Sequence, residues 1–115
     1  MSDPGAPSAD TMARLALCSC PDAGQAQALA GILVERRLAA CVSVLPQVRS
    51  VYRWQGKVER ADEALLLIKT VEARLVELEA AILEHHPYEL PEIIVVAVGS
   101  GLDRYLRWLH DETAP

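Results

Sequence analysis

Residues 64–68 read Ala-Leu-Leu-Leu-Ile, a continuous apolar run that lacks the polar–apolar alternation of a half-buried strand. The run follows a tight turn at residues 54–57, whose central Gln55-Gly56 pair is typical of a β-hairpin. We therefore place it in the second strand of that hairpin. Because a strand with apolar residues at successive positions is buried on both faces, any fold for this chain must cover both sides of this strand.

The other elements are predicted from hydrophobic periodicity. Residues 12–20 read as a strand that Pro21 ends, and Ala26, Leu29 and Leu33 then recur at helical spacing. The sequence predicts strands over residues 12–20, 40–54, 57–68 and 93–98, and helices over residues 22–37, over residues 73–86 and after residue 100.

Polar residues and a proline refine these boundaries. Asp22 and Gln25 match a capping box at the start of the first helix, and Ser100 and Asp103 match one at the start of the last. Pro46 interrupts the strand over residues 40–54, which indicates an edge strand or a bulge at that point.

The order of elements is β-α-β-β-α-β with a terminal helix, which is the split βαββαβ, ferredoxin-like arrangement of the α+β class. In this arrangement the helices lie on one face of the sheet, so they cover only one side of the run 64–68. The simplest cover for the other side is another copy of the chain. We predict one domain over residues 12–115, a disordered leader over residues 1–11, and an oligomer.

Charge and cysteine content bound the function. The net charge is −5 and no stretch is rich in Lys or Arg, so we expect no binding to nucleic acid, whose phosphates would be repelled. The odd set of Cys18, Cys20 and Cys41 gives no disulfide framework and favours a reducing cytoplasm, with Cys41 expected in the core. No apolar run approaches the roughly 20 residues of a membrane span. No arrangement of nucleophile and base indicates an enzyme.

Five segments resemble the CutA divalent-cation-tolerance family, in the family's order and spacing. They are Cys-Val-Ser-Val-Leu-Pro at 41–46, Tyr-Arg-Trp-Gln-Gly-Lys at 52–57, Leu-Ile-Lys-Thr at 67–70, His-Pro-Tyr-Glu-Leu-Pro-Glu at 86–92 and Tyr-Leu-Arg-Trp at 105–108. One departure is Ala97, where the family pattern leads us to expect proline. The resemblance implies a ferredoxin-like fold, a tightly packed homotrimer, a cytoplasmic location and a link to tolerance of divalent cations, copper especially. It also implies that Cys18, His85 and His86 are copper ligands.

Topology places Cys18 at the same end of the sheet as His85 and His86, and thiolate with imidazole suits copper or zinc. Consecutive helical residues point about 100° apart. The two histidines therefore share one ion only where Pro87 has already unwound the helix. The alternative is an exposed His85 beside a structural His86. Cys18 and Cys20 share one strand face, either as a soft-metal pair or as small buried residues.

A second hypothesis is a trimeric signalling or scaffold module similar to PII-type proteins. Such a module binds a small anion or a protein partner in the clefts between chains. The hairpin at residues 52–57, Lys69 and Glu89 would then matter more than the cysteines. Glu63 and Lys69 lie on one face of the third strand, at either end of an apolar stripe. We interpret them as a rim salt bridge at the trimer contact, and the alternative is that they line a pocket.

Overall fold

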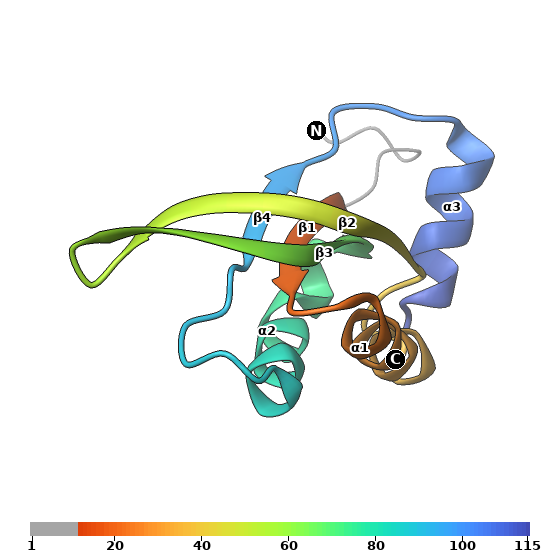
Figure 1. Ribbon diagram of the computed structural model, residues 1–115. Coiled ribbons are helices and arrows are strands. Elements are labelled where there is room, and N and C mark those ends of the chain that lie inside the picture. The colour runs from red at the N-terminus through yellow and green to blue at the C-terminus, as the bar shows by residue number, and fades with distance from the viewer. Residues whose placement is uncertain (1–11) are drawn as a thin grey trace.

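The computed structural model describes residues 12–115 as a four-stranded sheet with three α-helices (Figure 1). The predicted leader over residues 1–11 lies outside the described residues. The α+β class and the order of elements are confirmed. The elements are β1 (Ala13–Cys20), α1 (Ala23–Glu35), β2 (Cys41–Trp54), β3 (Lys57–Val71), the 3-10 turn η2 (Glu72–Arg74), α2 (Leu75–His85), β4 (Ile94–Ala97) and α3 (Asp103–Glu112).

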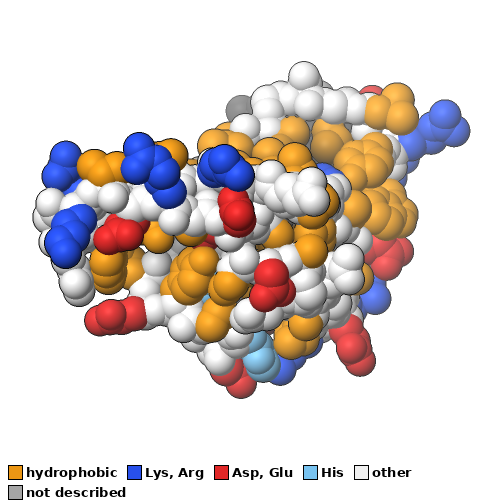
Figure 2. Space-filling view, viewed as in Figure 1, with side chains coloured by type: hydrophobic (Ala, Val, Ile, Leu, Met, Phe, Trp, Pro, Cys, Tyr) orange, Lys and Arg blue, Asp and Glu red, His pale blue; other side chains and the backbone are white. Residues whose placement is uncertain are grey.

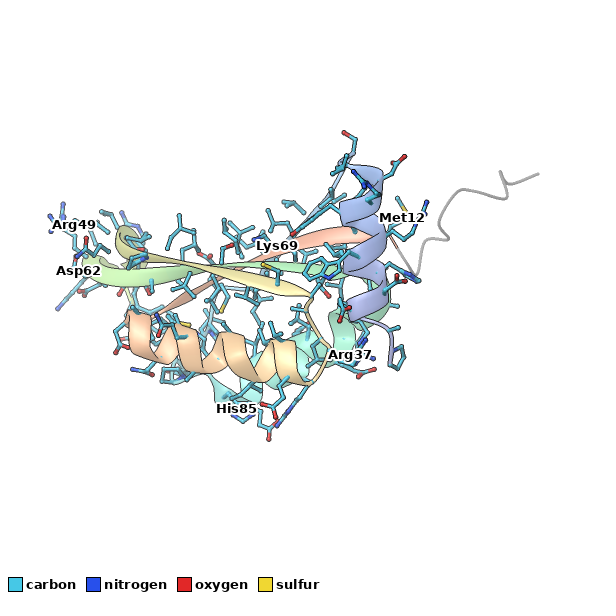
Figure 3. All side chains as sticks on the ribbon, turned by 90° about the vertical axis from the view of Figure 1, so that its right-hand side faces the viewer. Met12, Arg37, Arg49, Asp62, Lys69 and His85 are labelled. Carbon is cyan, nitrogen blue, oxygen red and sulfur yellow. The ribbon has the colours of Figure 1, made fainter. Side chains whose placement is uncertain are left out.

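The sheet has the strand order β2-β3-β1-β4, and each neighbouring pair is antiparallel. This is the split βαββαβ topology. Both α1 and α2 lie on one face of the sheet, and α3 stands at one end (Figures 1 and 3). Leu109 of α3 packs there with Ala40 and Val71. Within residues 12–115, no helix has the length and apolarity needed to cross a bilayer.

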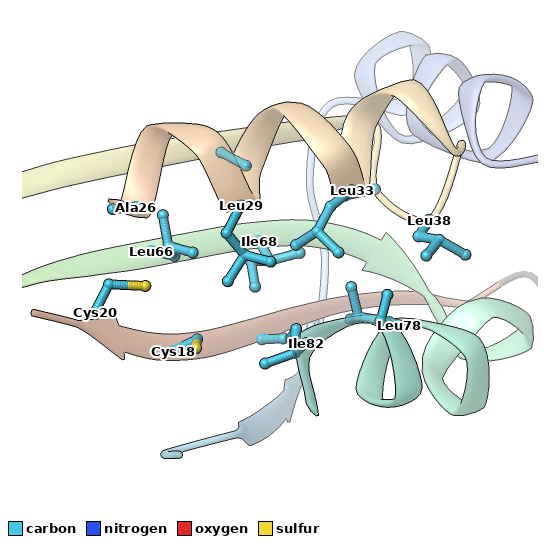
Figure 4. Packing of buried hydrophobic residues seen from close by; sticks show 14 of the residues in the cluster. Cys18, Cys20, Ala26, Leu29, Leu33, Leu38, Leu66, Ile68, Leu78 and Ile82 are labelled. Carbon is cyan, nitrogen blue, oxygen red and sulfur yellow. The ribbon is translucent and has the colours of Figure 1, made fainter. Parts of the chain in front are cut away.

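The core lies between the sheet and the helices α1 and α2, and alternate residues of the strands point into it. On β3, Ala64, Leu66 and Ile68 are 1% exposed or less. They pair across the sheet with alternate residues of β1, so both strands contribute every second side chain to the core. Figure 4 shows this packing, with Leu29 and Leu33 of α1 and Leu78 and Ile82 of α2 opposite the strand residues Cys18, Cys20, Leu66 and Ile68.

The opposite face of the sheet is apolar, and α3 covers only its end at Ala13 and Val71. Register places six large apolar residues of three strands on it: Leu15 and Leu17, Leu65 and Leu67, and Ile94 and Val96. Cys41 lies on this face too, opposite Lys69, and is only partly buried. The prediction that Cys41 belongs to the core was therefore wrong, because the strand alternation points it away from the helices. We call this surface the bare face.

The β2–β3 hairpin has the predicted turn and the predicted irregularity. Gln55 and Gly56 have φ values of 50° and 81°, so both central residues are left-handed, as in the turns that match strand twist. The pairing shifts register between Leu45 and Val48, around Pro46. Because β2 is also an outer strand, Pro46 marks both a bulge and an edge strand.

Helix starts were predicted with mixed success. The Asp22 carboxylate accepts a hydrogen bond of 2.8 Å from the Gln25 backbone N–H, which confirms the first cap. The predicted Ser100 cap was wrong, because α3 starts after Leu102 and no side chain caps it. Residues 72–74 form the turn η2 rather than the start of α2, and α2 ends at His85. His86 is extended, with ψ at 136°, because a residue before proline avoids the helical region.

Candidate metal centre

Three side chains with soft donor atoms meet near the end of β1. Cys18 and Cys20 point to the helix side of the strand because their positions alternate, and both are buried. His86 arrives from the residue that follows α2 and is 9% exposed. One ligand atom from each of Cys18, Cys20 and His86 lies within 4.8 Å of the others. We call these three residues the thiol–imidazole cluster.

The His86 ring is held by hydrogen bonds at both nitrogens. Nε2 lies 2.6 Å from the backbone oxygen of Ser19, and Nδ1 accepts a hydrogen bond of 3.1 Å from the Tyr88 backbone N–H. A carbonyl oxygen only accepts, so this pattern assigns the proton to Nε2 and leaves a neutral imidazole. A metal ion at either nitrogen displaces one of these two hydrogen bonds. Both ring nitrogens thus bond the backbone, as in the alternative of a structural His86, and a ligand role requires that one of these bonds be given up.

The two thiols interact directly and therefore differ in acidity. The Cys18 thiol donates a long hydrogen bond of 3.9 Å to the backbone oxygen of Ser19. The neighbouring thiol of Cys20 raises the pKa of Cys18, and Cys18 in turn lowers the pKa of Cys20. Burial raises the pKa of Cys18 further, and the negative charges of Glu92 and Glu63 act in the same direction. A bound cation would oppose the effects that raise the pKa of Cys18, because it favours the thiolate form of both cysteines.

His85 lies outside the thiol–imidazole cluster. Its Nε2 is 3.5 Å from the Arg36 guanidinium and 3.7 Å from a Glu84 carboxylate oxygen, at the helix surface (Figure 3). The neighbouring guanidinium opposes a second cation at this nitrogen. His85 does line a small hollow of about 230 Å³ together with Cys20 and His86. This hollow offers an entry path toward the cluster.

The donor set fits a soft metal ion. Thiolate and imidazole favour Cu(I) or Zn(II), whereas Ca²⁺ and Mg²⁺ require oxygen ligands. A structural zinc site has four protein ligands, and the cluster supplies three. The three donors therefore suit Cu(I) better, because it accepts a lower coordination number.

The structure brings two of the three predicted ligands together and adds a third that the prediction omitted. Cys18 and His86 belong to the cluster, and Cys20 takes the place expected for His85. The signal for Cys20 was present in the Cys18-Ser19-Cys20 spacing, which puts both sulfurs on one face. The ligand set of Cys18, His85 and His86 stays a prediction that only metal binding can test.

Fold and site together define a class: a small α+β protein with a split βαββαβ sheet, a largely uncovered apolar face and a buried cluster suited to a soft cation. Residues 14–112 match the family model described as CutA1 divalent ion tolerance protein. The chain belongs to this family, as its sequence segments indicated.

Relatives and solved structures agree with this assignment. The divalent-cation tolerance protein CutA of Pectobacterium atrosepticum is 45% identical over 94 residues, which cover 82% of this chain and 86% of that protein. Protein CutA of Mus musculus is 41% identical over 98 residues, which cover 85% of this chain but 55% of the mouse protein. The chain thus spans about half the length of the mouse protein. The crystal structure of CutA from Xylella fastidiosa has a TM-score of 0.86 at 43% identity and covers 89% of this chain and 98% of that one.

Proposed function

We propose that the protein is a homotrimeric copper-binding protein of divalent cation tolerance, which works in the cytoplasm by holding the ion rather than by catalysis. The observation that carries the metal part is the thiol–imidazole cluster, whose three donor atoms lie within 4.8 Å of one another. The family description supports the link to divalent cations. A reducing compartment suits the free thiols of all three cysteines.

The surfaces that one protomer leaves uncovered support assembly. The two outer strands, β2 and β4, each have one unpaired edge in the described sheet. Pairing the β2 edge of one copy with the β4 edge of the next is a head-to-tail contact, and such contacts form closed rings when the rotation allows. The apolar bare face favours burial in the same assembly. A ring of three copies is the assembly that the family resemblance implies.

Within each protomer, the proposed roles follow from position. Cys18 and Cys20 supply two thiolates, because a bound cation favours the thiolate form of both. His86 supplies a ring nitrogen after losing either the Ser19 or the Tyr88 hydrogen bond. Affinity for the ion should fall as pH falls, because protons compete for thiolates and imidazole.

The test is a titration of reduced, metal-free protein with Cu(I) in the presence of a competing chelator, with light-scattering mass measured on the same sample. We expect one ion per protomer and a mass of three chains of 12.5 kDa each. Loss of an outer-shell partner alone lowers metal affinity by roughly 10–100-fold. The double variant Cys18→Ser/Cys20→Ser removes two ligands, so it should lower Cu(I) affinity by more than that. Cys41→Ser is the matched control, because Cys41 lies on the bare face outside the cluster.

The two histidines separate the alternatives for the third ligand. His86→Asn should weaken Cu(I) binding, and His85→Ala should leave it nearly unchanged. A loss in His85→Ala as large as that in His86→Asn would support the set of Cys18, His85 and His86 instead. Equal affinity in wild type and the double cysteine variant would contradict a metal site at the cluster. A monomeric mass at micromolar concentration would contradict the trimer.

A further inference from the structure

A second concave site lies on the other side of β1 from the thiol–imidazole cluster. It is a groove of about 910 Å³ between the outer part of the hairpin and the segment that links α2 to β4. This volume is in the range of small-molecule sites, about 300–1,000 Å³. Figure 2 shows Lys and Arg side chains gathered over the outer part of the hairpin and hydrophobic side chains below it. The lining comes from Ser19, Ser50, Val51, Tyr52, Trp54 and Glu63, and from residues 87–92.

The charged groups in the lining are all acidic. Glu63, Glu89 and Glu92 line the groove, and no lysine or arginine of the described chain does. Glu63 is 9% exposed, so most of its surface is buried although it lines the groove. A small anion therefore does not suit this groove, because its three carboxylates would repel the anion.

The hydrogen bonding of Glu63 leaves the groove rich in acceptors. One carboxylate oxygen of Glu63 accepts a hydrogen bond of 2.8 Å from the Tyr88 hydroxyl. Burial, the hydrogen bond to Glu63 and the negative charge of Glu63 raise the pKa of Tyr88, so the Tyr88 hydroxyl keeps its proton and donates it in a hydrogen bond to the Glu63 carboxylate. Within residues 12–115, no other side chain hydrogen-bonds to the Glu63 carboxylate. A second Glu63 oxygen and the Tyr88 lone pairs thus remain for a ligand that donates.

Aromatic faces line the same groove. Tyr52 and Trp54 are 45% and 38% exposed, which is unusual for side chains of this size in one short segment. Trp and Tyr faces attract ammonium groups through the ring quadrupole. A hard divalent ion such as Mg²⁺ prefers a shell of oxygen ligands and water, and it gains little from such walls.

We propose that the groove between the hairpin and residues 87–92 binds an organic ammonium ion, with Glu63 as the counter-charge and Tyr52 and Trp54 as aromatic walls. This inference goes beyond the proposed copper function, because it uses none of the thiol–imidazole donors. The ligand's alkyl portion lies against the aromatic rings, and its N–H groups donate to the acceptors beside Tyr88.

The experiment uses Trp54 as its own reporter. The chain has two tryptophans, so Trp108→Phe leaves only Trp54 to fluoresce. This background protein, reduced and free of metal, is titrated with spermidine at constant ionic strength. We expect a saturable change in Trp54 fluorescence. In the same background, Glu63→Gln should weaken spermidine binding at least about tenfold.

The matched control is Glu79→Gln, which makes the same change of charge on the exposed surface of α2, outside the groove lining. It should leave spermidine affinity unchanged. The double variant Glu89→Gln/Glu92→Gln removes charge from the exposed part of the lining and should also weaken binding. It keeps the test decisive where Glu63→Gln fails to fold.

Several results would overturn the proposal. Equal spermidine affinity in the Glu63→Gln and Glu79→Gln proteins would show that the effect is general charge attraction. Displacement of spermidine by an equal concentration of Mg²⁺ would show a site for hard cations, and tighter binding of inorganic phosphate would show an anion site. Failure of acrylamide to quench Trp54 in the assembled protein would show that a second copy fills the groove.

Discussion

The two faces of β3 differ although neighbouring residues supply them. Toward the helices, Leu66 and Ile68 are fully buried, and Thr70 at the end of the same row is buried too. Toward the bare face, Leu65, Leu67 and Lys69 stay partly exposed in the protomer. The apolar run that requires burial on both sides is therefore only half covered by its own chain.

The difference shows which part of the sequence specifies the protomer and which part specifies its partners. The helix-covered row pairs with buried residues of β1 and packs against α1 and α2, so one chain completes it. The bare row pairs with Leu15 and Leu17 of β1, and a helix covers it only at its end, where Leu109 of α3 packs on Val71. Apolar residues in such a row contribute their full hydrophobic stabilisation only when another surface covers them.

The largest expected effect comes from placing one charge in each row. Leu66→Asp puts a carboxylate in the closed core and should cost more than about 4 kcal/mol, enough to unfold a protein of ordinary stability. Leu67→Asp puts it on the bare face, so the protomer should keep its secondary structure and lose the trimer. Circular dichroism and light scattering of both variants check this. A soluble trimer of Leu67→Asp would contradict the assignment of the bare face as an interface.

A smaller effect is expected from a buried hydrogen bond on the helix-covered row. The Thr70 hydroxyl donates a bond of 2.7 Å to the backbone oxygen of Leu38, and Thr70 is 0% exposed. Thr70→Val keeps the shape and leaves this carbonyl without that donor, which should lower the free energy of unfolding by about 1–3 kcal/mol. Urea unfolding measures it.

The control for Thr70→Val is Ser43→Ala on the bare face. Ser43 accepts a hydrogen bond from Lys69 at a partly buried position. Its loss leaves the lysine able to bind water, so the change in unfolding free energy should be smaller than for Thr70→Val. A larger loss of unfolding free energy in Ser43→Ala than in Thr70→Val would contradict the assignment of the Thr70 row as the more completely buried one.

The smallest effect concerns the start of α1, which closes the helix-covered face. Hydrogen bonds from the backbone N–H and side chain of Gln25 lower the pKa of the Asp22 carboxyl. A lowered folded-state pKa means that the contribution of Asp22 is present above its unfolded pKa of about 3.9 and is lost as pH falls through the folded value. Asp22→Ala should therefore lower Tm slightly near neutral pH, and the difference from wild type should shrink in strong acid.

The matched variant for this prediction is Asp22→Asn, because asparagine caps a helix without carrying a charge. Its Tm difference from Asp22→Ala should not change with pH between neutral pH and strong acid. Thermal unfolding followed by circular dichroism measures all three proteins. A Tm difference between wild type and Asp22→Ala that does not change with pH would show that the charge of Asp22 contributes nothing to stability.

Local signals in the sequence predicted local features correctly. The capping pair Asp22 and Gln25, the turn at Gln55-Gly56 and the bulge at Pro46 each depend on a few neighbouring residues. The Ser100 cap was wrong because a motif match does not determine where the chain enters α3.

The candidate site was predictable only in part, because its decisive contacts are distant in sequence. Strand alternation was sufficient to put Cys18 and Cys20 on one face. The hydrogen bond between His86 and Ser19 joins residues 67 positions apart, and no local pattern encodes it. The Tyr88–Glu63 bond that shapes the groove is equally a product of tertiary packing.

The segment from His86 to Tyr88 belongs to both proposed sites. The Tyr88 backbone N–H donates to the His86 ring, and the two rings lie 4.8 Å apart between centroids. An ion that takes Nδ1 of His86 releases the Tyr88 backbone, and an ammonium ion bound beside Tyr88 restrains it. Binding at one site then changes the affinity of the other. Thermodynamic reciprocity requires that copper change the affinity for the ammonium ion by the same factor by which the ammonium ion changes the affinity for copper. Copper affinity measured with and without spermidine therefore reports on the groove as directly as any change made within it.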